Sequence, residues 1–127
     1  MNGPARTSLT LVAGGRASER EAAIAAALVP DMDVAVILEG LPDGNATLAG
    51  ELPGAPHIVR IAPGCLCCAG NMILRVSLNR LLRRRPARLF ISLADSAHLE
   101  QLRSWLSRAP YDDLLHLDAD LQPARGT

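Results

Sequence analysis

Lysine is absent from this sequence, because all 13 basic residues are arginines. No site that depends on a lysine ammonium group can therefore form in the chain. Aromatic residues are scarce, at 2% of the 127 residues, which argues against a protein that stacks nucleic-acid bases on its aromatic side chains. The formal net charge is zero, and a nucleic-acid partner usually requires a strong basic excess.

Long apolar runs are also missing. No segment approaches the roughly 18 apolar residues that cross a bilayer, so no membrane association is expected. The first apolar stretch, residues 9–13, is shorter than the apolar core of a secretory signal, which has about 7–15 residues, and no cleavage signal follows it. The sequence therefore predicts a cytoplasmic protein, in a compartment where thiols stay reduced.

The composition is that of one folded domain. At 49% hydrophobic and 20% charged residues, the chain can bury a core. We expect the domain to occupy residues 8–119, after a polar lead at residues 1–7 and before a polar tail at residues 120–127.

Apolar runs of strand length alternate with helical patterns along this domain. Strands are expected near residues 8–13, 33–38, 57–61, 87–93 and 113–117, and helices near residues 18–29, 71–85 and 96–107. The run that begins at Asp33 is almost wholly apolar, which is typical of a strand buried on both faces. The alternation predicts an α/β fold with a parallel sheet and helices on both of its faces.

The three cysteines, Cys65, Cys67 and Cys68, all lie within four consecutive positions. Three thiolates on one loop can bind Zn²⁺ or another soft cation. Gly64 and Gly70 flank the loop and permit the unusual backbone dihedrals that such a turn requires. The spacing therefore indicates a metal site with three protein thiolates.

Zinc normally takes four ligands, so one ligand is missing from this loop. The side chains that could supply it are His57, His98, His116 and Glu39, and a water or another molecule could do so as well. Two alternatives stay open. The cysteines could be small buried apolar residues, or a redox pair, although a bridge between the neighbours Cys67 and Cys68 would be strained.

The segment GCLCC at 64–68 follows an expected strand and opens an expected helix, and it resembles the Cys-x-Cys-Cys motif of CobW-type GTPases. These P-loop proteins handle metals and are related to the hydrogenase and urease maturation GTPases. Four further segments are similar to the family in the same order. LTLVAGG at 9–15 is similar to the first strand and the start of the P-loop, and DVAVILEG at 33–40 to the second strand, with Glu39 at its acidic end. PARLFIS at 86–92 is similar to the strand before switch II, and LLHLDA at 114–119 to the strand that follows. The resemblance implies a three-layer P-loop NTPase-like fold and a metal-handling role.

The sequence departs from the family at the phosphate-binding loop, whose pattern is Gly-x-x-x-x-Gly-Lys-Ser/Thr. We take Gly14 as the first glycine of this pattern. Glu19 then stands at the position of the second glycine, Arg20 at that of the lysine and Glu21 at that of the hydroxyl residue. Residues 18–21 fit a capping box in which Ser18 caps the helix and Glu21 reaches back to it. The two carboxylates would repel a triphosphate, whereas Arg20 could attract one. GTP and Mg²⁺ are therefore not expected as cofactors.

A second departure lies at the end of the fourth strand, where Ser92 occupies the family's acidic position and no switch glycine follows. Asp95 could act as a displaced magnesium ligand, or Asp95 or Ser96 could simply cap the next helix. The family's guanine-recognition segment and its separate C-terminal domain lie beyond the matching residues, which end near Ala119. We therefore expect a truncated form of the family's nucleotide-binding domain.

These observations predict a divergent CobW-like protein that binds Zn²⁺ through Cys65, Cys67 and Cys68, with His98 or Glu39 as a further candidate ligand. Nucleotide binding and GTP hydrolysis are expected to be lost or impaired, and no residue is assigned a catalytic role. The residues that remain for a cofactor in the degenerate P-loop are Gly14, Gly15 and Arg20. The expected partners are a metal ion and either a metalloprotein client or a second copy of the chain. A GTP-dependent metallochaperone and a non-catalytic interaction module are the alternatives.

Overall fold

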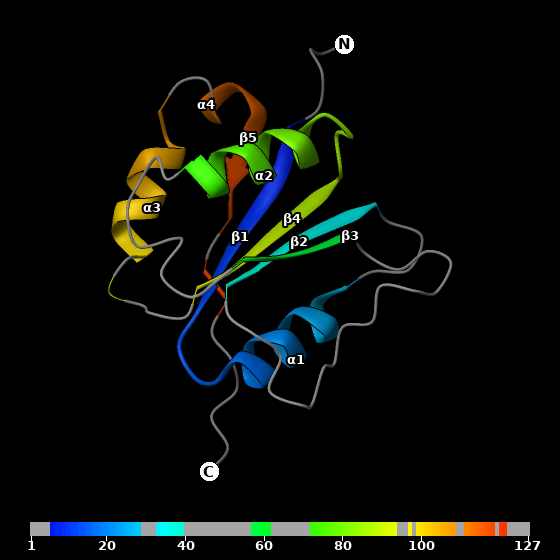
Figure 1. The fold of residues 1–127 in the computed structure, drawn as a ribbon, viewed down its shortest axis with the longest axis vertical. Coiled ribbons are helices and arrows are strands. Elements are labelled where there is room, and N and C mark those ends of the chain that lie inside the picture. The colour runs from blue at the N-terminus through cyan, green and yellow to red at the C-terminus, as the bar shows by residue number, and fades with distance from the viewer. Residues whose placement is uncertain are drawn as a thin grey trace.

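The computed structural model describes residues 6–28, 33–39, 57–61, 72–93, 97, 99–108, 111–118 and 120–121. Within these residues, a five-stranded sheet forms the centre of the molecule, and its strands are all parallel (Figure 1). In the spatial order β3-β2-β4-β1-β5, the strands are His57–Ile61, Val34–Glu39, Arg88–Leu93, Thr7–Ala13 and Leu115–Leu117. The helices are α1 (Ala17–Ala27), α2 (Met72–Leu82), α3 (Leu99–Leu106) and α4 (Tyr111–Leu114).

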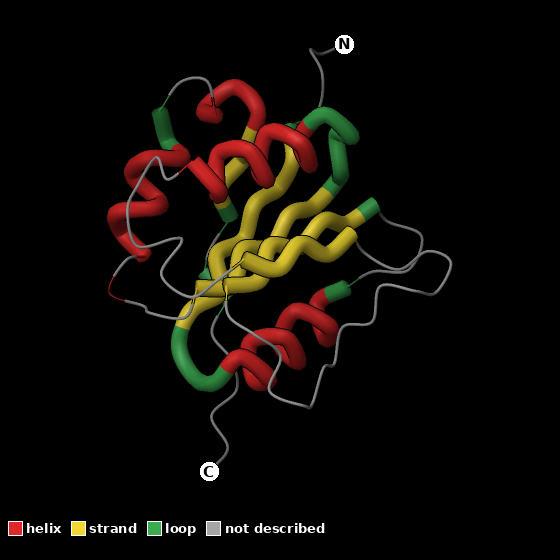
Figure 2. Tube along the Cα trace, viewed as in Figure 1, coloured by secondary structure: helices red, strands yellow, loops and turns green. Residues whose placement is uncertain are grey.

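Helices cover both faces of the sheet, as Figures 1 and 2 show. The core between the sheet and α1 contains Val12, Ile24, Val34, Val36, Leu38 and Phe90. The larger core, between the other face and α2, α3 and α4, is built around Leu11, Ile37, Leu74, Leu78, Ile91, Leu102 and Leu106. Strands β1, β2 and β4 contribute to both cores, which explains their nearly continuous apolar runs. The predicted three-layer α/β fold is confirmed.

The order of the strands positions the candidate site. The chain leaves β1 through α1 on one face of the sheet and leaves β4 through α3 and α4 on the other face. The neighbouring strands β1 and β4 pair from Ser8↔Arg88 to Ala13↔Leu93, so their carboxyl ends lie side by side. In parallel α/β sheets, ligands bind outside the carboxyl ends of strands at a point where the connections diverge in this way. No helix in the described ranges is long and apolar enough to cross a membrane.

The last expected strand, at residues 113–117, is wrong at its start, because Tyr111–Leu114 form the single-turn helix α4 and β5 begins at Leu115. Tertiary contacts hold this turn. The ring of Tyr111 packs against Trp105 of α3 with 4.9 Å between the ring centroids, and its hydroxyl donates a hydrogen bond of 3.1 Å to Asn79 Oδ1 on α2. A single helical turn is too short to show a periodic pattern, so the sequence favoured an extended strand.

Candidate functional site

The turn between β1 and α1 is made by two glycines. The φ angles of Gly14 and Gly15 are 94° and 67°. Residues other than glycine rarely adopt this left-handed backbone conformation. A Cβ atom on Gly15 would also lie 2.9 Å from Oε1 of Glu19. The two glycines therefore allow the chain to leave the sheet and enter α1 within three residues.

The capping box predicted for residues 18–21 is wrong. The N-cap of α1 is Arg16, so Glu19 and not Glu21 occupies the third helical position. The backbone N–H of Arg16 donates a hydrogen bond of 2.6 Å to Oε1 of Glu19, and Ser18 lies inside the first turn of the helix. The glycine turn places the N-cap two residues earlier than expected, and this leaves Glu21 free to make a different contact.

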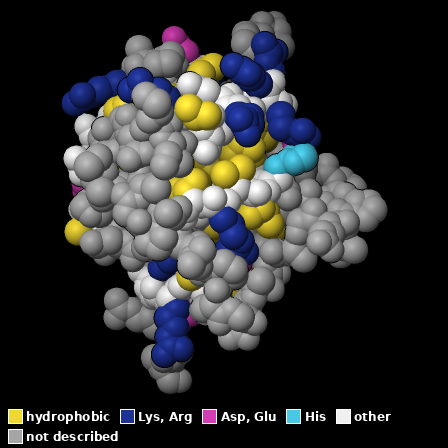
Figure 3. Space-filling model, viewed as in Figure 1, with side chains coloured by type: hydrophobic (Ala, Val, Ile, Leu, Met, Phe, Trp, Pro, Cys, Tyr) yellow, Lys and Arg dark blue, Asp and Glu magenta, His cyan; other side chains and the backbone are white. Residues whose placement is uncertain are grey.

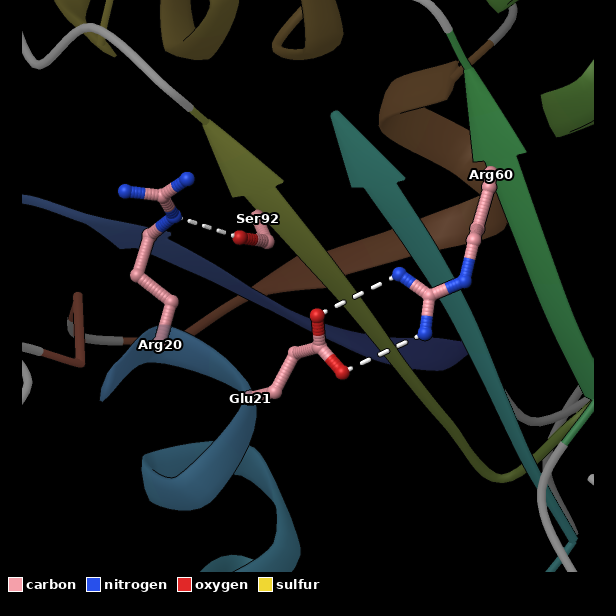
Figure 4. Close-up of polar contacts among 4 residues, drawn as sticks. All are labelled: Arg20, Glu21, Arg60 and Ser92. Carbon is pink, nitrogen blue, oxygen red and sulfur yellow. Dashed lines mark hydrogen bonds and ion pairs between the residues drawn. The ribbon is translucent and has the colours of Figure 1, made fainter. Parts of the chain in front are cut away.

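The side chain of Arg20 is buried at the carboxyl ends of β1 and β4, and only 3% of the residue is exposed. Its Nε atom donates a hydrogen bond of 2.7 Å to the hydroxyl oxygen of Ser92, the last residue but one of β4 (Figure 4). Its Nη1 atom donates to the main-chain oxygens of Gly15 at 2.8 Å and of Gly14 at 3.4 Å. The structure thus brings together Gly14, Gly15 and Arg20, and it adds Ser92.

The negative charges of three carboxylates interact with the guanidinium group of Arg20. Burial lowers the pKa of Arg20 from its ordinary value, and the negative charges of Glu39, Glu21 and Glu19 oppose this shift. The guanidinium group of an arginine is not deprotonated in proteins, so Arg20 keeps its charge. The site therefore holds a permanent positive charge that the protein's own acidic and carbonyl groups compensate.

Glu21, the neighbour of Arg20 on α1, points toward β3 and forms a two-pronged ion pair with Arg60 (Figure 4). The distances are 3.2 Å from Nη1 to Oε2 and 3.3 Å from Nη2 to Oε1. The side chain of Glu21 is 4% exposed and that of Arg60 is 27% exposed. The pair fastens α1 to the edge strand of the sheet. In the sequence count from Gly14, Glu21 stands at the position where the P-loop pattern has its magnesium-binding hydroxyl.

Sequence reasoning missed the partners of Arg20, Glu21 and Ser92, although one signal was present. Along β3, Val59 and Ile61 pack into the core beneath α2, so the alternation of a strand places Arg60 on the face that α1 covers. A buried acidic partner on α1 could have been inferred from this alternation.

The cysteines Cys65, Cys67 and Cys68, with the flanking Gly64 and Gly70, lie outside the described residues, and so do His98, Asp95 and Ser96. Within the described ranges, no group of three or more His, Cys, Asp or Glu residues is arranged to hold a metal ion.

The structure does place three of the residues suggested as a fourth ligand. Glu39, 6% exposed, pairs in register with Ile61, the last residue of β3 before the cysteine segment. His57 lies at the opposite end of β3, where it pairs with Ala35. His116 lies on β5, at the other edge of the sheet, 3.3 Å from Asp118. Of these three, Glu39 lies at the end of the sheet from which the chain enters the cysteine segment.

Comparison with known proteins gives one relevant match, to the zinc chaperone YeiR of Escherichia coli (strain K12). The two sequences are 34% identical over 82 residues, which is 64% of this chain and 22% of YeiR. The chain thus spans about a fifth of the length of this relative. No family model matches the chain. No solved structure matches it. The match supports a CobW-like relationship for the part of the chain that it covers.

Proposed function

We propose that this protein binds Zn²⁺ through Cys65, Cys67 and Cys68 and acts as a metal-binding accessory protein of the CobW-like type, without nucleotide hydrolysis. The observation that carries this proposal is the occurrence of three thiols within four positions in a chain related to a zinc chaperone. Thiolates are ligands that Zn²⁺ favours, and a reduced compartment keeps them available. Glu39 is the described candidate for a fourth ligand, beside His98, a water or a client side chain.

Three features of the residues in α1 and β4 support the loss of nucleotide chemistry. The guanidinium of Arg20 is already bonded to Ser92 and to the carbonyls of Gly14 and Gly15, so a phosphate would have to displace these contacts. Glu21 occupies the position of the magnesium-binding hydroxyl and is paired with Arg60. The acidic position at the end of β4 holds Ser92, which offers a metal ion no negative charge.

One observation favours the alternative of a GTP-dependent metallochaperone. Arg20 holds a permanent cation where the connections of the sheet diverge, and this is the place where parallel α/β sheets bind anionic ligands. The alternative requires Arg20 to leave Ser92 and turn toward a phosphate. Nucleotide titration separates the two proposals.

Metal titration of protein that was purified without chelators and fully reduced tests the main proposal. We expect about one Zn²⁺ or Co²⁺ per chain, with metal–sulfur distances of about 2.3 Å by X-ray absorption. Binding should weaken as the pH falls below neutrality, because protons compete for the thiolates. The variant Cys67→Ser should lose most of the binding, since two thiolates and a borrowed ligand make a poor site.

The matched control is His116→Gln, which removes an exposed candidate ligand at the far edge of the sheet and should leave metal binding unchanged. If fully reduced protein takes up neither Zn²⁺ nor Co²⁺, the proposal is wrong and the cysteines are apolar filling. The interaction-module alternative would then stand.

A further inference from the structure

The zero net charge of this chain conceals a strong separation of charge along the sequence. Residues 52–94 contain none of the 13 acidic residues and seven of the 13 arginines, namely Arg60, Arg75, Arg80, Arg83, Arg84, Arg85 and Arg88. The remaining residues therefore carry all of the acidic side chains. A segregation of this kind gives one part of the surface a positive potential in an otherwise neutral protein.

Helix α2 and the turn after it display most of this positive charge. Leu74, Leu78 and Leu81 of α2 are buried against the sheet. The arginines of α2 and the following turn are all exposed: Arg75, Arg80, Arg83, Arg84 and Arg85. Figure 3 shows dark blue side chains over and beside the position of α2. The ion pairs between described residues involve Arg60, Arg88, Arg103 and His116, and none of these five arginines.

An apolar side chain lies in the middle of these charges. Val76 is 50% exposed, more than the other large hydrophobic residues that the structure describes. With Asn79, Arg80 and Arg83 it lines a hollow of ≈ 220 Å³ on the outer face of α2. These four positions follow the i, i+3, i+4, i+7 spacing of one helix face. The face thus combines an apolar centre with a charged rim, which is the arrangement of a protein–protein contact.

We propose that this face of α2, the basic face formed by Val76, Asn79, Arg80 and Arg83, docks an acidic segment of a partner protein. The carboxylates of the segment pair with Arg80 and Arg83, whose planar guanidinium groups bind carboxylates with two hydrogen bonds. An apolar side chain of the segment covers Val76. Charge complementarity selects this occupant, because α2 has no acidic residue of its own.

Nucleic acid fits this face less well than an acidic peptide does. No aromatic residue occurs in α2, so unpaired bases would have nothing on which to stack. The helix has 11 residues and so spans only about 16 Å, which suits a short peptide segment. Because α2 begins at Met72, four residues after Cys68, a docked partner is tethered close in sequence to the cysteine segment. This last link rests on the proposed function, whereas the docking itself does not.

Fluorescence anisotropy with a labelled 12-residue peptide of glutamates and one central leucine tests the docking. The same peptide with every Glu replaced by Gln is the first control, and single-stranded DNA of 12 nucleotides is the second. We expect the acidic peptide to bind at least about tenfold more tightly than either control, and more weakly as the salt concentration rises. The double variant R80E/R83E should lose at least about tenfold in affinity.

The matched charge reversal is Arg108→Glu, which changes an exposed arginine two residues after α3 and should alter peptide affinity by less than about twofold. All three arginines are exposed, so thermal unfolding should confirm that the variants stay folded. Cys67→Ser should keep full peptide affinity, and this separates a failure of the metal site from a failure of the docking face. Equal peptide binding by R80E/R83E, or DNA binding as tight as peptide binding, would overturn the proposal. Self-association in sedimentation experiments that R80E/R83E abolishes would also overturn it, because a second copy would then be the occupant.

Discussion

Arg20 Nε donates a 2.7 Å hydrogen bond to Ser92 Oγ and so joins the first turn of α1 to the end of β4, across 72 residues of sequence. The carbonyls of Gly14 and Gly15 accept hydrogen bonds from the same guanidinium group. Counted from Gly14, Arg20 stands at the position where the P-loop pattern has the lysine that reaches the phosphates. Here the cation at that position is bonded within the protein, and the glycine turn, α1 and β4 are held together by it.

Replacing Arg20 should therefore destabilise the fold. Arg20→Met leaves the Ser92 hydroxyl and two carbonyls without a donor, and we expect a loss of about 1–3 kcal/mol in the free energy of unfolding in urea. Arg16→Met is the control, because the Arg16 side chain is exposed, and it should change stability by less than about 0.5 kcal/mol. A double-mutant cycle with Ser92→Ala should show a coupling energy of at least about 0.5 kcal/mol. Additive effects would contradict a direct Arg20–Ser92 interaction.

Nucleotide binding should be weak or absent. Calorimetry with Mg²⁺ and GTP or ATP should show no binding near 1 µM, an affinity that corresponds to about −8 kcal/mol. A dissociation constant of about 1 µM or tighter that is lost in Arg20→Met would support the GTP-dependent alternative and refute our proposal. Hydrolysis assays on the same samples should show no release of phosphate above the buffer control.

The ion pair between Glu21 and Arg60 predicts that removing Arg60 alone lowers stability more than removing the charges of both residues. Arg60→Gln leaves the nearly buried carboxylate of Glu21 without its charged partner, and we expect a loss of about 1–3 kcal/mol in unfolding free energy. The double variant E21Q/R60Q should recover part of this loss, because a neutral amide is less costly to bury than an unpaired carboxylate. A double variant less stable than the sum of the single variants would contradict this interpretation.

Stability should fall at alkaline pH through Tyr111. Burial raises the pKa of the Tyr111 phenol, and Arg75 partly opposes the shift. A raised pKa in the folded state means that the unfolded chain loses this proton first, so stability declines as the pH rises through and above about 10. Tyr111→Phe should reduce this decline in urea unfolding between pH 8 and pH 11. The original protein and the Tyr111→Phe variant differ in no other titratable group, so identical pH profiles would show that the phenol contributes nothing.

Most of the fold could be predicted from the sequence, because the buried strands consist of nearly continuous runs of apolar residues. The run in β2 is buried throughout, and burial on both faces requires helices on both sides of the sheet. Helix α4 could not be predicted, because its single turn depends on the contact of Tyr111 with Trp105 and Asn79. These partners belong to other helices, and no local pattern records them.

The candidate site was less predictable, because α1 is rich in alanine. An apolar stripe is hard to see in such a helix, and the residues it buries are Arg20, Glu21 and Ile24. Two of these are charged, and the sequence pattern places Arg20 in the degenerate P-loop and Glu21 in a capping box. Their burial depends on partners 39 and 72 residues away, Arg60 and Ser92, which local spacing does not reveal.

The position of β1 between β4 and β5 has a consequence for how the protein folds during its synthesis. β1 is synthesised before the other described strands, yet its described neighbours in the sheet are β4 and β5, and Ser8 pairs with Arg88. At about 5–20 residues per second, the ribosome takes on the order of 4–16 s to synthesise the 80 residues between them. During this time the apolar side chains of β1 and β2 have no finished sheet to enter. The apolar side chains of these strands therefore stay without their partners in the sheet until β4 has left the exit tunnel, and the sheet is expected to form only after that point.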